Sequence, residues 1–132
     1  YAVAEPLYRR ALAINEKMLG PEHPGVATSL NNLAGLLQVK GDYAAAEPLH
    51  RRALVIREKV LGPDHPDVAD SLNDLAALLW ATGDHAAARA LFRRALAIFT
   101  NALGPNHPST SRVRENLAEI DKASAPTVPK QP

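Results

Sequence analysis

The chain has 132 residues, of which 46% are hydrophobic and 22% are charged, and its formal net charge at neutral pH is +1. This balance of charge gives no electrostatic reason to expect binding to nucleic acid or to an anionic membrane, since both require a basic excess. No apolar run approaches the ~20 residues of a membrane span, and the absence of cysteine excludes disulfides and thiolate metal sites.

The sequence repeats itself with a period of 42 residues. Residues 1–42 align without gaps to residues 43–84, and the two segments are identical at 29 of 42 positions. A third copy, residues 85–126, keeps 17 identities with the second, mostly in its first half. Repeats of this length are typical of solenoids, in which one unit cannot enclose a core alone and must stack on its neighbours.

The first element of each period is a longer helix. In the second copy, Asp42 can accept hydrogen bonds from its first free N–H groups, and Gly62 followed by Pro63 ends it. Pro6 and Pro48 lie about six residues into this helix in their copies, which predicts a bend near its start or a late start. Its apolar positions form one stripe: Ala46, Leu49, Ala53, Ile56 and Val60.

A shorter helix follows the loop. It is expected to start at Pro66, because the missing N–H of proline is harmless in a first turn. Its apolar stripe in the second copy is Val68, Leu72, Leu75 and Leu79. In the last copy the slots of Val68, Leu72 and Leu79 hold Thr110, Arg114 and Asp121. That last helix therefore buries one side only and is expected to cap the stack.

Residues 30–54, LNNLAGLLQVKGDYAAAEPLHRRAL, resemble the tetratricopeptide repeat. The signature slots hold Leu33, Ala34, Leu37, Gly41, Tyr43, Ala46 and Ala53. The period of 42 with LGPxHPxVAxSLNxLA is similar to the long-repeat subtype of kinesin light chains and of many bacterial repeat proteins. The resemblance implies an all-α fold, a right-handed superhelix of about six antiparallel helices. It also implies that the shorter helices line a concave groove that holds peptides from other proteins.

The resemblance sets the expected domain organisation. One solenoid is predicted over residues 1–123, followed by a flexible tail over 124–132. Its parts are a half repeat (1–20), two full repeats (24–61 and 66–103) and a C-terminal capping helix (108–123). The first helix lacks a preceding partner, so we expect a partly uncovered apolar face and weak self-association there. That face comprises Leu7, Ala11, Ile14 and Met18.

Polar side chains recur on the shorter helices opposite the buried stripe, and we interpret this face as a peptide-binding groove. An amide offers two donors and an acceptor, so asparagine can bind the backbone of an extended peptide. Alternatively, Asn31 and Asn73 join neighbouring helices and hold the curvature. Trp80 is either a binding anchor or a cover over the adjacent helix end. The predicted groove residues are Thr28, Asn31, Asn32, Gly35, Gln38, Asp70, Asn73, Ala77, Trp80, Arg112 and Glu115.

Two binding modes known in the family do not carry over. Proteins that clamp a C-terminal carboxylate use an asparagine where this chain has Gly35, Ala77 and Glu119. Kinesin light chain grooves for acidic peptides need basic residues, and here Arg112 and Lys122 are diluted by neighbouring acids. The resemblance therefore does not identify the ligand.

No residue pattern indicates catalysis or a cofactor. His23, His65 and His107 recur once per repeat, but equivalent loops lie on the order of 16–20 Å apart, whereas metal–nitrogen bonds are ~2 Å. Loop packing and helix capping account for them, and no metal is expected. His50 and His85 occupy slots of aromatic residues, so both are predicted to replace a core aromatic. No phosphate-binding loop and no nucleophile elbow is present, so we expect no enzyme.

The favoured hypothesis is a non-enzymatic module that binds another protein or peptide, with a cytoplasmic location as the default expectation. A second hypothesis is a structural spacer within a longer repeat array. The third and weakest is nucleic-acid binding through Arg89, Arg93, Arg94 and Arg112. Neither nucleic acid nor a membrane is expected as a partner.

Overall fold

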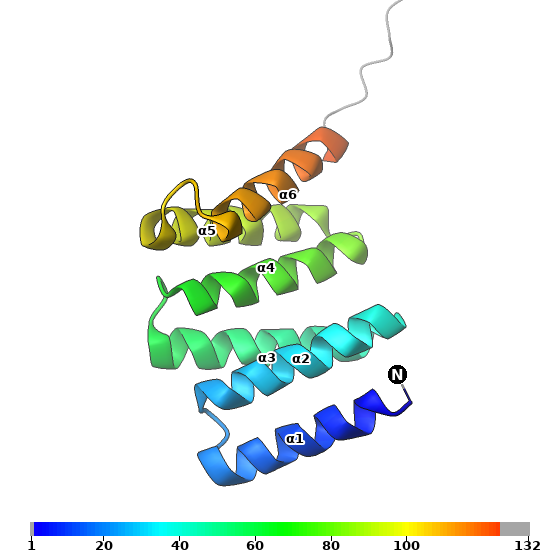
Figure 1. Cartoon of the computed structure of the whole chain (residues 1–132). Coiled ribbons are helices and arrows are strands. Elements are labelled where there is room, and N and C mark those ends of the chain that lie inside the picture. Colours follow the sequence, from blue (N-terminus) through cyan, green and yellow to red (C-terminus); the bar gives the residue numbers. More distant parts are fainter. Residues whose placement is uncertain (1, 125–132) are drawn as a thin grey trace, which may run out of the picture.

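A computed structural model of the protein describes residues 2–124, so the predicted tail beyond Ser124 lies outside the described residues. Within this part the chain forms six antiparallel α-helices and no strand. They are α1 (Ala4–Leu19), α2 (Pro24–Lys40), α3 (Tyr43–Leu61), α4 (Pro66–Ala81), α5 (His85–Leu103) and α6 (Pro108–Ser124). Each helix packs against the next in the chain, and Figure 1 shows the resulting stack. The predicted all-α right-handed superhelix is confirmed.

Side chains in the loops fix where the helices begin. Asp42 and Asp84 cap the longer helices α3 and α5, because their Oδ1 atoms accept hydrogen bonds from backbone N–H groups at 3.3 and 3.4 Å. The recurring histidines cap the shorter helices. The Nδ1 atoms of His23, His65 and His107 each accept from the N–H two residues further on, at 2.9, 3.0 and 3.1 Å. Capping is therefore the observed role of the recurring loop histidines.

The two prolines of the longer helices occupy different positions. α3 begins at Tyr43, so Pro48 lies inside the helix and the expected late start is wrong. Here proline removes the N–H that would bond to the carbonyl of Ala44. α1 begins at Ala4, so Pro6 lies in the first turn, where its missing N–H has no intrahelical acceptor. Both prolines are exposed.

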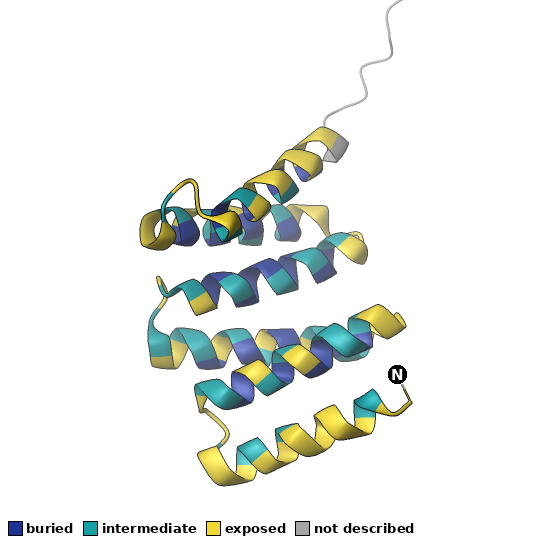
Figure 2. Cartoon of the chain, in the orientation of Figure 1, coloured by how far each residue is buried: buried dark blue, intermediate teal, exposed yellow. Residues whose placement is uncertain are grey.

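The apolar core runs along the stack between successive helices. Its largest cluster joins α4, α5 and α6, and a smaller one joins α2 to α3. α1 contributes no buried residue, and Figure 2 shows it largely exposed while α4 is almost wholly covered. Leu7, Ile14 and Met18 are 59%, 50% and 74% exposed, which confirms the predicted uncovered face.

The positions of the prolines predict unequal effects on stability. Pro48→Ala restores a helix-interior hydrogen bond and should raise the free energy of unfolding by roughly 1–3 kcal/mol. Pro6→Ala is the matched control and should change it by less than about 0.5 kcal/mol. Urea unfolding followed by circular dichroism measures both. Equal effects of the two substitutions would contradict the assigned helix starts.

Candidate peptide-binding groove

The predicted groove residues differ widely in exposure. Thr28, Asn32, Arg112 and Glu115 are exposed, whereas Asn73 is buried. The remaining members are half-buried: Asn31, Gly35, Gln38, Asp70, Ala77 and Trp80. They lie on α2, α4 and α6, the three shorter helices. The polar face is therefore not uniform, and the contacts of each member decide which part can take a ligand.

Between α2 and α4 the polar side chains bond to one another. Asn31 Nδ2 donates to Ser71 Oγ of α4 at 3.3 Å. The ring of His50, from α3, lies with Nδ1 3.3 Å from Asn31 Oδ1 and Nε2 3.3 Å from Gln38 Oε1. A neutral imidazole donates through one of these nitrogens only. This α2–α4 network, defined by Asn31, Gln38, His50 and Ser71, gives Asn31 the structural role that the sequence left open.

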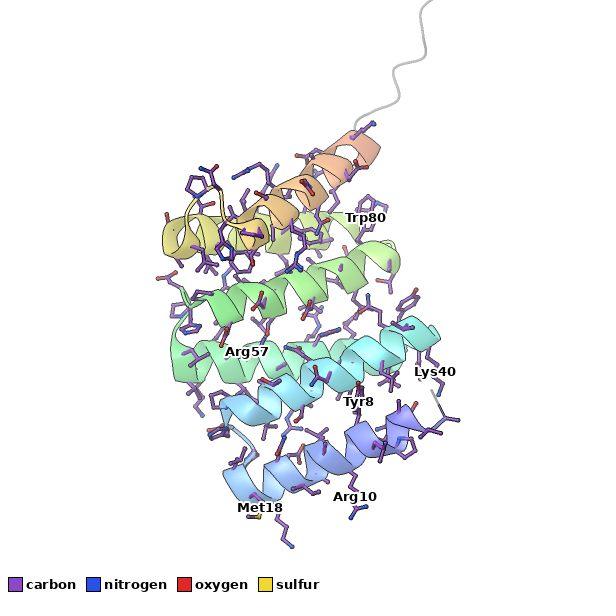
Figure 3. All side chains as sticks on the ribbon, in the orientation of Figure 1. Tyr8, Arg10, Met18, Lys40, Arg57 and Trp80 are labelled. Carbon is purple, nitrogen blue, oxygen red and sulfur yellow. The ribbon has the colours of Figure 1, made fainter. Side chains whose placement is uncertain are left out.

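Arg57 extends this network, and the sequence reasoning missed it. Its guanidinium donates to Ser71 Oγ at 2.9 Å, to the carbonyl of Asp67 at 3.2 Å and to Thr28 Oγ1 at 3.3 Å. Figure 3 shows the labelled Arg57 side chain in this part of the stack. The 42-residue repeat could have indicated this position, because both repeats have a polar side chain there. Asn15 holds the equivalent position one repeat earlier, and its Nδ2 donates to Ser29 Oγ at 2.6 Å.

One repeat later the same positions are no longer polar. Asn73 corresponds to Asn31, but the slots of His50 and Ser71 are held by Phe92 and Val113. Asn73 is 8% exposed, and its Oδ1 has no hydrogen-bond partner among the described residues. The replacement of both partners by apolar side chains explains this, since neither Phe92 nor Val113 offers a donor.

A hollow of about 160 Å³ begins at Ala77, one helical turn after Asn73, and we call it the Trp80 hollow. It lies between α4 and α6 over Phe92 of α5. Its lining residues are Ala77, Trp80, Phe92, Asn116, Glu119 and Ile120. An engineered apolar cavity of about 150 Å³ can hold benzene, so this space suits one branched aliphatic or aromatic side chain. The sequence indicated Ala77 and Trp80 for the groove, but not the floor residue Phe92.

Trp80 forms one wall of the hollow and is held in place by packing. Its ring stacks on that of His85, with centroids 3.8 Å apart and an interplanar angle of 28°. Figure 3 shows Trp80 near the C-terminal end of α4, on the side towards α6. His85 is exposed, so the prediction that it replaces a core aromatic is wrong, whereas His50 is buried as predicted. The stacking pre-organises Trp80 without filling the hollow.

Carboxylates of α4 add negative charge to the inner face. Burial, and then the charge of Asp70, raise the pKa of Asp74 to about 6, although Arg57 and Arg112 oppose this shift. The pKa of Asp70 is also raised, first by burial and then by Asp67. Burial is the largest cause of both shifts, and the two nearby arginines do not offset it.

The arginine cluster proposed for nucleic acid is partly neutralised. Arg94 lies 3.1 Å from Glu58 Oε1, and Arg89 Nε lies 3.1 Å from Asp121 Oδ1. Arg112 lies close enough to Asp70 and Asp74 to affect their pKa values. Each of these acids lies on a different helix from the arginine that it affects. Counting the arginines along the sequence therefore overestimated the positive charge that is free to bind nucleic acid.

No group of three or more His, Cys, Asp or Glu side chains within residues 2–124 is placed to hold a metal ion. Among the same residues, no helix is both long enough and apolar enough to cross a membrane.

Stacked helix pairs with a polar inner face define this chain as an α-solenoid. Family comparison agrees, since the tetratricopeptide repeat matches residues 1–54, 26–101 and 75–124. The chain belongs to the tetratricopeptide repeat family. Its members are in general protein–protein interaction modules, and proteins with this fold are in general non-enzymatic scaffolds.

Solved structures show the same fold. BtubC (BKLC) from P. vanneervenii is 31% identical with a TM-score of 0.83, and the match covers 91% of this chain and 48% of BtubC. A Podosopora anserina protein, assigned as a kinesin light chain with nearly identical TPR-like repeats, is 30% identical with a TM-score of 0.84. That match covers 92% of this chain and 58% of the other. The chain thus spans about half the length of these proteins. No curated protein matches it.

The α2–α4 network predicts a pH dependence of stability. Burial lowers the pKa of His50 to about 4, from an ordinary value of 6.5. As the pH falls from 6.5 to 4, the unfolded ring takes up a proton and the folded ring does not, so the contribution of His50 to the free energy of unfolding falls by on the order of 3 kcal/mol. The contribution of Asp74, whose pKa is raised, increases over the same range. His50→Phe, which installs the residue type of the next repeat, should remove the loss due to His50. Unfolding free energies between pH 7.5 and 4 measure it.

His85→Gln is the control for that experiment. It also removes one histidine, but from an exposed position, so this variant should keep the pH dependence of the wild type. Equal pH slopes for the wild type and His50→Phe would show that His50 is not the buried group responsible.

Proposed function

We propose that this chain is a non-enzymatic interaction module that binds an extended peptide segment of a partner protein on its concave face. The groove between α4 and α6 is the main site. The observation that carries this proposal is the Trp80 hollow, whose lining residue Ala77 lies one helical turn after Asn73, the residue with the unpaired Oδ1. A buried carbonyl without a donor costs about 1–3 kcal/mol. A peptide N–H that reached it would recover that free energy.

The hollow supplies the second half of the argument. An extended peptide presents alternate side chains to one face, so one apolar side chain can enter the Trp80 hollow while the neighbouring backbone N–H approaches Asn73. Trp80 and Phe92 offer aromatic surface, which is enriched in binding hot spots. Glycine at position 35 and alanine at position 77 leave room for a backbone along the rest of the face.

The remaining predicted residues extend the groove along the stack. Four of them are exposed and can contact a longer peptide without local unfolding of the helices: Thr28, Asn32, Arg112 and Glu115. Asn31 and Gln38 already bond within the α2–α4 network, so a ligand would have to compete for them. We therefore assign them a smaller share of the binding energy than Asn73 and Trp80.

The test uses peptides selected from a phage-displayed library of random 12-residue peptides against the immobilised wild-type chain. Trp80→Gln, which installs the residue of the preceding repeat, should weaken the selected peptides about tenfold or more. Asn73→Ala should weaken them about threefold to tenfold. Val55→Ala, on the exposed outer side of α3, is the control and should bind as the wild type does. Isothermal titration calorimetry measures each affinity.

Circular dichroism at the binding temperature establishes that each variant is folded. Full affinity in a folded variant carrying both Trp80→Gln and Asn73→Ala would exclude the α4–α6 groove as the binding site.

A second function, as one unit of a longer array, is favoured by the uncovered face of α1. The apolar residues with which α3 packs against α2 are Ala46, Leu49, Ala53 and Ile56. The same four residue types occupy the equivalent positions of α1. Ile56 is 4% exposed, whereas its counterpart Ile14 is 50% exposed. We propose that a further helix of the α2 type covers this face.

Charge supports the same proposal. Arg52 and Arg94 each pair with a glutamate of the preceding longer helix, at 2.9 Å to Glu16 and 3.1 Å to Glu58. Arg10 holds the equivalent slot on α1 and has no such partner among the described residues. Figure 3 shows Arg10 and Met18 pointing away from the stack. Two copies meeting through α1 would bring their Arg10 side chains together, so self-association should be weak.

An N-terminal extension tests this second function. A duplicate of residues 43–84 fused before residue 1 should cover α1 and place the duplicate of Glu58 opposite Arg10. Amide exchange in residues 4–19 should then slow at least tenfold, because apolar burial stabilises the helix against local opening. Sedimentation equilibrium of the unextended chain should show only weak dimerisation. Unchanged exchange in α1 of the extended chain would contradict the proposal.

A further inference from the structure

The charges around the Trp80 hollow bear on which peptide it takes, an inference that rests on the function proposed above. Glu119 lies on the hollow wall, and Glu115 lies one helical turn before it on the same side of α6. Neither forms an ion pair within residues 2–124, whereas Asp121 on the same helix pairs with Arg89 at 3.1 Å. The wall of the hollow therefore presents carboxylates that no cation of the fold neutralises by direct contact.

The other charged groups near the hollow do not reverse this balance. α4 contributes Asp70 and Asp74, and α6 contributes Arg112 and Lys122 besides its two glutamates. Arg57 of α3, which donates to Ser71, Thr28 and a backbone carbonyl, also acts on both aspartates. Four carboxylates thus face three cations, and two of these, Arg57 and Arg112, already interact with the aspartates.

The buried amide lies close to this acidic surface along α4. Asn73 is more than nine-tenths buried, its Oδ1 has no hydrogen-bond partner among the described residues, and Asn73 and Phe92 hold the slots of Asn31 and His50. Phe92 lines the Trp80 hollow, and so does Ala77, one helical turn after Asn73. An apolar side chain in the hollow would thus bring the peptide backbone within about one helical turn of this amide.

We propose that the α4–α6 groove selects an extended segment in which one apolar residue is accompanied by lysine or arginine within two positions along the chain. The apolar side chain fills the Trp80 hollow, and the backbone N–H beside it donates to Asn73 Oδ1. The cationic head lies at Glu119, with Glu115 in reach of a longer side chain. An acidic segment is rejected, because its carboxylates would face those of α6 and α4.

The random 12-residue peptides selected on the wild-type chain provide the first readout. Recovered sequences should be enriched in Leu, Ile, Met or Phe with Lys or Arg one or two positions away. Affinities follow from the fluorescence of Trp80, which is the only tryptophan of the chain and lines the hollow. Glu119→Gln should weaken the best peptide about threefold and Glu119→Lys about tenfold. Higher salt should reduce both differences.

An experiment that exchanges the charges of peptide and protein distinguishes a direct contact of the peptide cation with Glu119 from a general electrostatic effect of the protein. A peptide whose lysine is replaced by glutamate should bind Glu119→Lys better than it binds the wild type. Asp64→Lys makes the same change of charge in an exposed loop and should leave affinity within about twofold.

The outcomes distinguish this inference from the proposed function. If the selected peptides lose affinity with Trp80→Gln but carry acidic or uncharged flanks, or bind Glu119→Lys as tightly as the wild type, the groove function stands and the basic specificity is wrong. If Trp80→Gln and Glu119→Lys both leave binding unchanged, both proposals fail.

Discussion

The fold depends on one constraint: a pair of antiparallel helices cannot bury its own apolar stripe, so each pair must be covered by the next. The contacts between α2 and α3 recur between α4 and α5 because the same residue types meet at an interval of 42. Ion pairs follow the same interval, with Arg52 on Glu16 and Arg94 on Glu58. Equivalent positions in successive repeats therefore have equivalent neighbours. Where the residue at such a position differs between repeats, its effect can be traced to the contacts that are lost or gained.

Function in such a chain lies in the differences between repeats. His50 and Ser71 satisfy Asn31 and join three helices, which closes the surface between α2 and α4. Phe92 and Val113 leave Asn73 Oδ1 without these partners, and Phe92 lines the Trp80 hollow. We propose that this difference of two residues between repeats replaces a structural polar network with a binding site on the same scaffold. In that proposal the carboxylates of α6 give the site its charge.

Periodicity predicted the helices and their caps, because these depend on spacing along the chain. It did not predict the hydrogen-bond and ion-pair partners of the polar side chains on the shorter helices. His50 and Arg57 reach the α2–α4 network from another helix, and Glu58 and Asp121 neutralise arginines by the same kind of long-range contact. Pro48 was expected to mark either a bend or a late helix start, and the helix in fact begins before it, at Tyr43.

Nuclear magnetic resonance of the side-chain amides tests the central claim most directly. The NH2 resonances of Asn31 and Asn73 can be followed in a ¹⁵N-labelled chain as a bound peptide approaches saturation. We expect a large shift of the Asn73 NH2 resonances and of the Trp80 indole N–H resonance. We expect little change for Asn31, whose hydrogen bonds are internal. A bound peptide that shifts Asn31 and leaves Asn73 and Trp80 unchanged would contradict this claim.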